Sequence, residues 1–310
     1  MTRNIEKLKD ALSLISNLRK FVILKFTSEV LNVISVNGGS VSSEPQVWCK
    51  IPISRLFETI EIQSMRDNTI SMEINVDLLL QTLKNFDKAN SEGLNIRLQR
   101  NETSGEPGAV AKSGRTASLA LFYSNININS NIINHTFRIP VKILREAQDM
   151  LSEPTHSDMG LIMRLPNEFI TMFKRLDKFR KTQNDTVLIQ ASKSKGLSFV
   201  LEEEGKFKVT ISWNNKLEVH KPNNSDADSL RESLRTAEGL SDASQVNTDV
   251  YPDDIESNVK LKDWQSASKI VGRCKTVILY IAERECSLHC LLDETEDVEL
   301  VYFINSVRIV

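Results

Sequence analysis

Short segments of two kinds follow one another in the same order twice along this chain. The first kind alternates apolar and polar residues or is apolar throughout, as β-strands are, and it occurs mostly in closely spaced pairs. The second kind repeats apolar residues every three or four positions, as amphipathic helices do. Residues 5–143 place a helix, a hairpin with further strands, a second helix and three closing strands in that order, and residues 159–310 repeat it. We therefore expect an α+β architecture of two repeated domains built mainly from antiparallel sheet.

The strand predictions rest on runs rich in Val, Ile, Leu and Phe that are separated by short loops. In the first half they are 21–27, 30–36, 47–51, 60–65, 70–74, 94–99, 117–123 and 136–141. In the second half they are 161–165, 187–191, 197–201, 207–213, 258–261, 277–282, 287–292 and 299–304. Residues 136–141 and 207–213 each place their apolar side chains on one face.

Four segments show helical spacing. The first carries Ile5, Leu8, Leu12 and Ile15 at intervals of three and four residues, with Asn4 as a possible cap. The other three stripes lie at 76–86, 169–176 and 264–271. Asn75 precedes the second helix, and Pro166 and Asn167 precede the third, so these residues are predicted to cap the helices.

The predicted domains are residues 1–143 and 159–310, joined by a connector at 144–158. Two insertions interrupt them, a glycine-rich loop at 101–115 and an acidic segment at 222–257. The acidic segment has nine acidic residues against two arginines, a charge of −7 in a chain whose net charge is −2, so the remainder carries +5. We expect the acidic segment to be disordered and the folded part to be basic, because the segment has too few large apolar residues to offset the entropy of ordering.

No run of 18 apolar residues and no signal-like start are present, so we expect a soluble intracellular protein with no membrane partner. The cysteines Cys49, Cys274, Cys286 and Cys290 sit in or beside apolar runs, as buried free thiols do. The sequence contains no phosphate-binding glycine loop, zinc motif or nucleophile elbow. The histidines are expected to be solvated or packed singly. We therefore predict no catalytic residues, no metal site and no cofactor.

The polar faces of three helices are basic. When each helix is projected at 100° per residue, its lysines and arginines fall opposite the apolar stripe. The predicted DNA-facing set is Lys84, Lys88, Lys174, Lys178, Lys181, Lys262, Lys269 and Arg273. Phosphate binding needs several such cations and no base contacts, and the stripes lack the aromatic residues on which single-stranded bases stack. One basic face alone would be an ordinary solvated surface, but three in a repeated frame favour duplex DNA.

Short sequence segments spread over nearly the whole chain resemble those of DNA sliding clamps. The resemblance is strongest to the Hus/Mec-type subunit of the checkpoint clamp called the 9-1-1 complex, in its fungal form. The segments are VWCKIP at 47–52, FRIPVK at 137–142, AQD at 147–149, KLKDW at 260–264, SK at 268–269, SLHC at 287–290 and VYFI at 301–304. Their order and spacing carry the match, since none is a catalytic motif. Clamp subunits of this type begin with a strand before the first helix. Here only residues 1–4 precede that helix, so we expect either a start further upstream or an exposed sheet edge in the first domain.

The resemblance implies a sliding-clamp fold with sheets outside and helices lining the interior of a ring. It implies a non-enzymatic subunit that joins two other clamp-like subunits, is loaded onto double-stranded DNA by an ATP-dependent clamp loader in the nucleus, and promotes checkpoint kinase signalling and repair. The DNA contacts would be independent of sequence. The resemblance implies ring closure through edge strands, which here are residues 136–141 and 207–213; the alternative is that both are internal strands. The predicted interface residues are Phe137, Arg138, Ile139, Phe207, Lys208, Val209 and Ile211. Two alternatives remain open: a homotrimeric replication clamp, and an enzyme with an unrecognised site.

Overall fold

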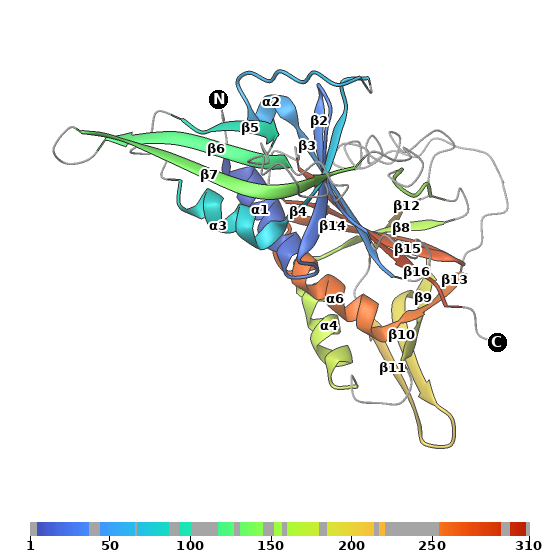
Figure 1. Cartoon of the computed structure of the whole chain (residues 1–310). Coiled ribbons are helices and arrows are strands. Elements are labelled where there is room, and N and C mark those ends of the chain that lie inside the picture. The colour runs from blue at the N-terminus through green and yellow to red at the C-terminus, as the bar shows by residue number, and fades with distance from the viewer. Residues whose placement is uncertain are drawn as a thin grey trace, which may run out of the picture. The chain divides into compact units, whose positions relative to one another are not determined.

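A computed structural model of the chain confirms the repeated α+β architecture (Figure 1). The structure describes residues 5–36, 44–65, 67–86, 93–100, 117–126, 131–144, 152–156, 160–179, 185–213, 217–220, 254–292 and 298–307. Two compact units divide the chain. The first comprises Met1–Val36, Val47–Leu151 and Leu292–Leu300, and the second comprises Asn37–Gln46, Ser152–Leu291 and Val301–Val310. The chain passes from the first unit to the second between Leu151 and Ser152, within residues 144–158. Residues 37–46 also belong to the second unit, and 292–300 to the first.

The first unit is an antiparallel sheet with two helices that pack against each other. Its strands are β1 (Phe21–Phe26), β2 (Val30–Ser35), β3 (Gln46–Pro52), β4 (Ile70–Asn75), β5 (Asn95–Arg100), β6 (Ala117–Ile126) and β7 (Ile132–Ile143). They lie in the order β3-β2-β1-β4-β7-β6-β5. The helices α1 (Ile5–Ser16) and α3 (Val76–Lys84) run side by side, and a short helix α2 (Ile53–Leu56) follows β3.

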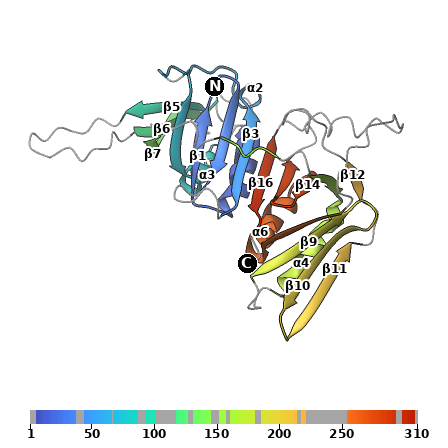
Figure 2. The same ribbon diagram turned by 90° about the vertical axis from the view of Figure 1, so that its right-hand side faces the viewer.

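The second unit contains two sheets and a second pair of helices. The strands β12 (Glu218–His220), β8 (Leu161–Leu165), β14 (Thr276–Ala282), β15 (Glu285–Leu291) and β16 (Glu299–Asn305) follow one another in one sheet. The other sheet has the order β11 (Phe207–Trp213), β10 (Gly196–Glu203), β9 (Thr186–Ser192) and β13 (Asp254–Lys260). A 3-10 turn, η3 (Asn167–Phe169), leads into α4 (Ile170–Asp177), which packs against α6 (Leu261–Val271). Figure 2 shows the strands β9, β10 and β11 lying side by side in the smaller sheet.

Local sequence explains the start of the helices. The stripe Ile5, Leu8, Leu12 and Ile15 is at most 3% exposed, which confirms the predicted apolar face of α1. Asn75 caps α3 as predicted, because its side chain accepts hydrogen bonds from the backbone of Asp77 (3.0 Å) and Leu78 (3.3 Å). The cap predicted at the third helix is wrong. Asn167 lies inside the 3-10 turn, and no side chain caps that turn or α4.

Three other predictions need correction. Residues 60–65, predicted as a strand, form none, and the large side chains at the two ends of this segment are exposed, Ile60 by 38% and Met65 by 106%. The strand predicted at 258–261 begins earlier, at Asp254, and therefore takes residues 254–257 from the predicted disordered segment. The rest of that segment, 222–253, and the insertion 101–115 lie outside the described residues. Within the described part of the chain, no helix is long and apolar enough to cross a bilayer.

Candidate nucleic-acid interface

A buried aromatic cluster holds α4 and α6 together in the second unit. The ring of Phe173 on α4 stacks on Trp264 of α6, with centroids 5.1 Å apart and planes at 14°. Phe199 of β10 lies 5.2 Å from Trp264, and Phe169 reaches both Phe199 and Trp213. Because these rings occupy one face of each helix, the other face of each helix is left for polar residues.

The polar face of α4 carries three exposed cations and one exposed carboxylate, that of Asp177. Lys174 and Arg175 lie in its last turn and Lys178 is its C-cap, and all three side chains are exposed opposite the buried Phe173 and Leu176. Cations in the last turn of a helix are also favoured by the partial negative charge of the helix C-terminus. Arg175 was missed in the sequence prediction, although it is a cation on the polar side of the same helix. Lys181, which was predicted, lies outside the described residues.

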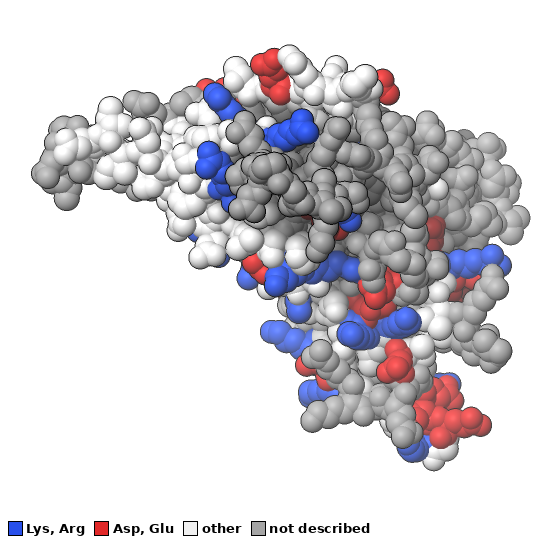
Figure 3. Space-filling view, viewed as in Figure 1, with Lys and Arg blue, Asp and Glu red and all other residues white. Residues whose placement is uncertain are grey.

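The polar face of α6 carries the second group of cations. Lys262 and Lys269 are exposed on the helix, and Arg273 is exposed just after its C-cap Gly272. Figure 3 shows Lys and Arg side chains over the area where Figure 1 places α4 and α6, with some acidic side chains beside them. The tertiary packing therefore brings together five of the predicted DNA-facing residues, Lys174, Lys178, Lys262, Lys269 and Arg273, on two adjacent helices.

One of the two cations predicted in the first unit lies on a described helix. Lys84 is exposed in the last turn of α3, but Asp77 is exposed in the first turn of the same helix. The helix ends at Lys84, and Lys88 lies outside the described residues. On α1, Lys9 pairs with Glu6 at 2.8 Å. Among the described residues, the cationic helix surface thus belongs mainly to the second unit.

The predicted interface residues lie on β11, an edge strand, and on β7, which lies between β4 and β6 but pairs with β4 only from Val141 to Ile143. On β7, Phe137 is half-buried, Ile139 is buried and Arg138 is exposed, so the predicted alternation is confirmed. On β11, Phe207, Val209 and Ile211 are half-buried and Lys208 is exposed. In the described part of the chain, β11 pairs only with β10, and the outer edge of β5 has no strand partner.

The prediction that the histidines pack singly is wrong for His156 and His289. Their Nε2 atoms lie 3.0 Å apart, and Nε2 of His289 is 3.2 Å from the hydroxyl of Ser287. His156 also packs against the rings of Tyr280 and Phe303. The contact joins residues 133 positions apart, which no local pattern indicates. His289 is only 5% exposed, so this cluster offers little surface to a substrate.

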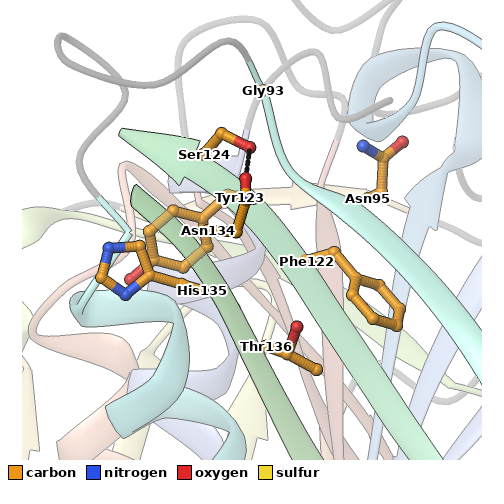
Figure 4. A pocket seen from close by; sticks show the side chains of 8 residues that line it. All are labelled: Gly93, Asn95, Phe122, Tyr123, Ser124, Asn134, His135 and Thr136. Carbon is orange, nitrogen blue, oxygen red and sulfur yellow. Dashed lines mark hydrogen bonds between the residues drawn. The ribbon is translucent and has the colours of Figure 1, made fainter. Parts of the chain in front are cut away.

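The described residues form a small hollow and no cluster suited to a metal ion. A hollow of about 200 Å³ lies beside Asn95, Phe122 and His135, where Ser124 donates a 2.7 Å hydrogen bond to Asn134 (Figure 4). Its volume is below the usual range of roughly 300 to 1,000 Å³ for ligand pockets. The described side chains contain no group of three His, Cys, Asp or Glu residues that could hold a metal ion. All four cysteines are free and buried, as predicted.

Comparison with known proteins decides the family. Residues 1–308 match the family described as Hus1-like protein. The chain belongs to this family. It is 27% identical to the DNA damage checkpoint control protein MEC3 of Eremothecium gossypii, over 92% of this chain and 89% of that protein. It is 23% identical to the protein of the same name from Saccharomyces cerevisiae, over 96% of this chain and 95% of that protein.

Solved structures confirm the sliding-clamp fold. The structure of PCNA from Thermococcus kodakaraensis aligns with a TM-score of 0.59 and 9% identity, over 98% of both chains. This low identity supports the fold alone, whereas the family match favours the checkpoint clamp over the homotrimeric replication clamp. Fold and family together identify a clamp-type DNA damage checkpoint protein.

Proposed function

We propose that the chain is one subunit of a heterotrimeric ring that encircles double-stranded DNA at sites of damage and promotes checkpoint kinase signalling and repair. Two unlike clamp-like subunits would complete the ring, and an ATP-dependent loader would place it on DNA in the nucleus. The observation that carries this proposal is the cationic surface of α4 and α6, built on a buried aromatic core within a sliding-clamp fold.

The chemistry of this surface suits sliding. Lysine ammonium groups on flexible stems neutralise phosphates without requiring a fixed geometry, and phosphate contacts carry no sequence information. Such contacts hold DNA loosely and are weakened by salt. In a closed ring, retention would then depend on topology, and the cations would centre the duplex. We propose that Lys84, Lys174, Lys178, Lys262, Lys269 and Arg273, together with Lys88 and Lys181, face the DNA.

Ring closure supplies the second part of the proposal. The edge of β7 in one subunit and the edge of β11 in another would each receive a strand from a neighbour, because an open edge offers unpaired backbone N–H and C=O groups. Phe137, Arg138 and Ile139 would line one closure. Phe207, Lys208, Val209 and Ile211 would line the other.

Retention on DNA tests the proposal. The chain is co-expressed with the two clamp subunits and loaded onto nicked circular DNA, which is then linearised. We expect a stable heterotrimer on the circle and loss of the ring from the linear ends. A homotrimer, or a monomer that leaves circular and linear DNA equally fast, would contradict the proposal.

Charge reversal tests the DNA-facing residues separately. The double variant Lys174→Glu with Lys178→Glu should lose about two phosphate contacts. The slope of log K for DNA binding against log salt concentration should then become less steep, since each phosphate contact contributes roughly 0.9 to its magnitude. The matched control is Lys195→Glu with Arg284→Glu, which changes the charge equally at two exposed turns of the same unit. Equal effects of the two double variants would exclude α4 from the DNA interface.

A further inference from the structure

The edge of β7 has a defined length and two different faces. Val141, Lys142 and Ile143 pair with β4, whereas Thr136–Pro140 pair with β6 and have no strand on their other side among the described residues. One face of this open stretch is apolar: Phe137 is half-buried, Ile139 is buried, and Ile133 before them is 45% exposed. The other face presents Arg138, which is exposed. A strand that pairs here must therefore offer apolar side chains on one face and a polar group to Arg138 on the other.

The sheet around this edge is positively charged. The strands β5, β6 and β7 contain three arginines and one lysine, and no acidic residue. Arg97 and Arg138 are on the same face, because both lie in register with Ala120 of the strand between them. Lys142 is opposite Glu73 of β4, which balances its charge.

The two arginines have no carboxylate partner in the described part of the chain. The Nε of Arg138 donates to the side-chain oxygen of Gln99 at 3.4 Å, and the guanidinium of Arg97 lies 5.9 Å from the centre of the Phe122 ring. Both contacts leave the positive charge unneutralised. An opposite charge on a neighbouring strand stabilises pairing, whereas a like charge opposes it.

The open edge of β11, the strand proposed to close the ring, does not supply that carboxylate. The strand β11 reads FKVTISW, so its only charged residue is Lys208. Lys208 points to the exposed face, as Arg138 does, and pairs with Glu202 of the adjacent strand at 2.8 Å. If β11 of a second copy paired with β7 so that the apolar faces formed one surface, Lys208 and Arg138 would share the opposite face. Two copies would then bring two cations and no anion to their facing strands.

We infer that β7 receives a strand of a different protein, which carries apolar residues on one face and at least one carboxylate opposite Arg138, and that this charge requirement disfavours pairing of β7 with β11 of a second copy of this chain. The inference rests on the proposed ring function and adds the chemistry of the neighbouring strand. Charge selection of this kind acts against the wrong partner as well as for the right one.

The deciding experiment measures assembly, independently of DNA. The chain and its Arg138→Glu variant are each titrated with the two co-purified clamp subunits, and the dissociation constant is measured by sedimentation. We expect Arg138→Glu to weaken assembly about tenfold, because one attractive cross-strand pair becomes repulsive. The matched control, Arg100→Glu, makes the same charge change at an exposed position of β5 on the other face of this sheet, and it should assemble as the unaltered chain does.

A second measurement uses the chain alone. The unaltered chain should not self-associate through β7, whereas Arg138→Glu should bind a second copy several-fold more tightly, because a carboxylate now meets Lys208. Thermal unfolding of each variant verifies that it is folded. Unchanged assembly of Arg138→Glu, or self-association of the unaltered chain through β7, overturns the inference. Failure of the ring to stay on circular DNA, with the charge effect on assembly intact, would instead overturn the proposed function.

Discussion

The ring of Phe173 stacks nearly parallel on the indole of Trp264, which ties α4 to α6 at the centre of the second unit. Trp264 is fully buried, and Phe173 is 2% exposed. The stack sets the spacing of the two helices and so determines how far apart their cationic faces lie. A core contact thereby positions a surface that is proposed to bind DNA.

Removing this stack should destabilise the second unit. Phe173→Ala deletes a buried aromatic ring, and we expect a loss of about 3 to 5 kcal/mol in the free energy of unfolding. Urea unfolding followed by Trp fluorescence measures it. The control is Phe21→Ala, because the Phe21 side chain is 53% exposed and should cost much less. Equal losses for the two variants would show that the stack is not a principal contact.

A methyl group at Gly160 should also be destabilising. A Cβ at this position would overlap the buried ring of Tyr280, so the substitution overpacks the core. We expect Gly160→Ala to cost about 1 to 3 kcal/mol, measured by thermal or urea unfolding. Gly272→Ala is the matched control, since a Cβ there would make one tight contact, 3.3 Å from the backbone oxygen of Ser268, but would overlap no ring, and the φ angle of Gly272 is an ordinary −68°. A Gly160→Ala variant as stable as the control would contradict the packing.

The cap of α3 gives a smaller prediction. Asn75→Ala removes the acceptor for two backbone N–H groups and should lower the free energy of unfolding by about 0.5 to 2 kcal/mol. Asn75→Asp keeps a side-chain oxygen at the same place and should retain most of the stability. Circular dichroism during urea unfolding compares the unaltered chain with the two variants. Identical midpoints for the unaltered chain and Asn75→Ala would show that the cap contributes nothing.

Because Cys286 is buried, we expect the stability of the fold to decrease at alkaline pH. Burial, with a smaller contribution from the charge of Glu285, raises the pKa of the Cys286 thiol above its usual value. The native state therefore retains this proton at pH values where the unfolded chain has lost it. The resulting stability is complete below the unfolded pKa of about 8.5 and decreases as the pH rises above it.

Two measurements check this effect. Native Cys286 should resist alkylation at a pH of about 9, whereas the unfolded chain should react. Replacing Cys286 with Ala should make the free energy of unfolding less dependent on pH between about 8.5 and 10. Rapid alkylation of Cys286 in the folded protein would contradict the assignment.

Much of the architecture follows from local sequence. The stripes of α1, α3, α4 and α6, the alternation of β7 and β11, and the Asn75 cap are all readable from residues within a few positions of one another, because helices and strands have fixed periods. The same periods place Lys174, Lys178, Lys262, Lys269 and Arg273 opposite the apolar faces. Segments resembling known clamps, in order along the chain, pointed to the family.

Tertiary structure decided the features that depend on distant partners. Residues 60–64 have a strand-like composition, but no strand in the described part of the chain pairs with them, and Asp254 and Glu256 join β13 because β9 offers a partner edge. Likewise, His156 meets His289 across 133 positions. Because of the strand order, residues Thr136–Pro140 of β7 pair with a strand on one side only. Arg138 therefore lies at an open edge, and no carboxylate of the described residues lies beside it. The spacing of apolar residues is a property of one segment, whereas the spatial neighbours of a residue depend on how the whole chain folds.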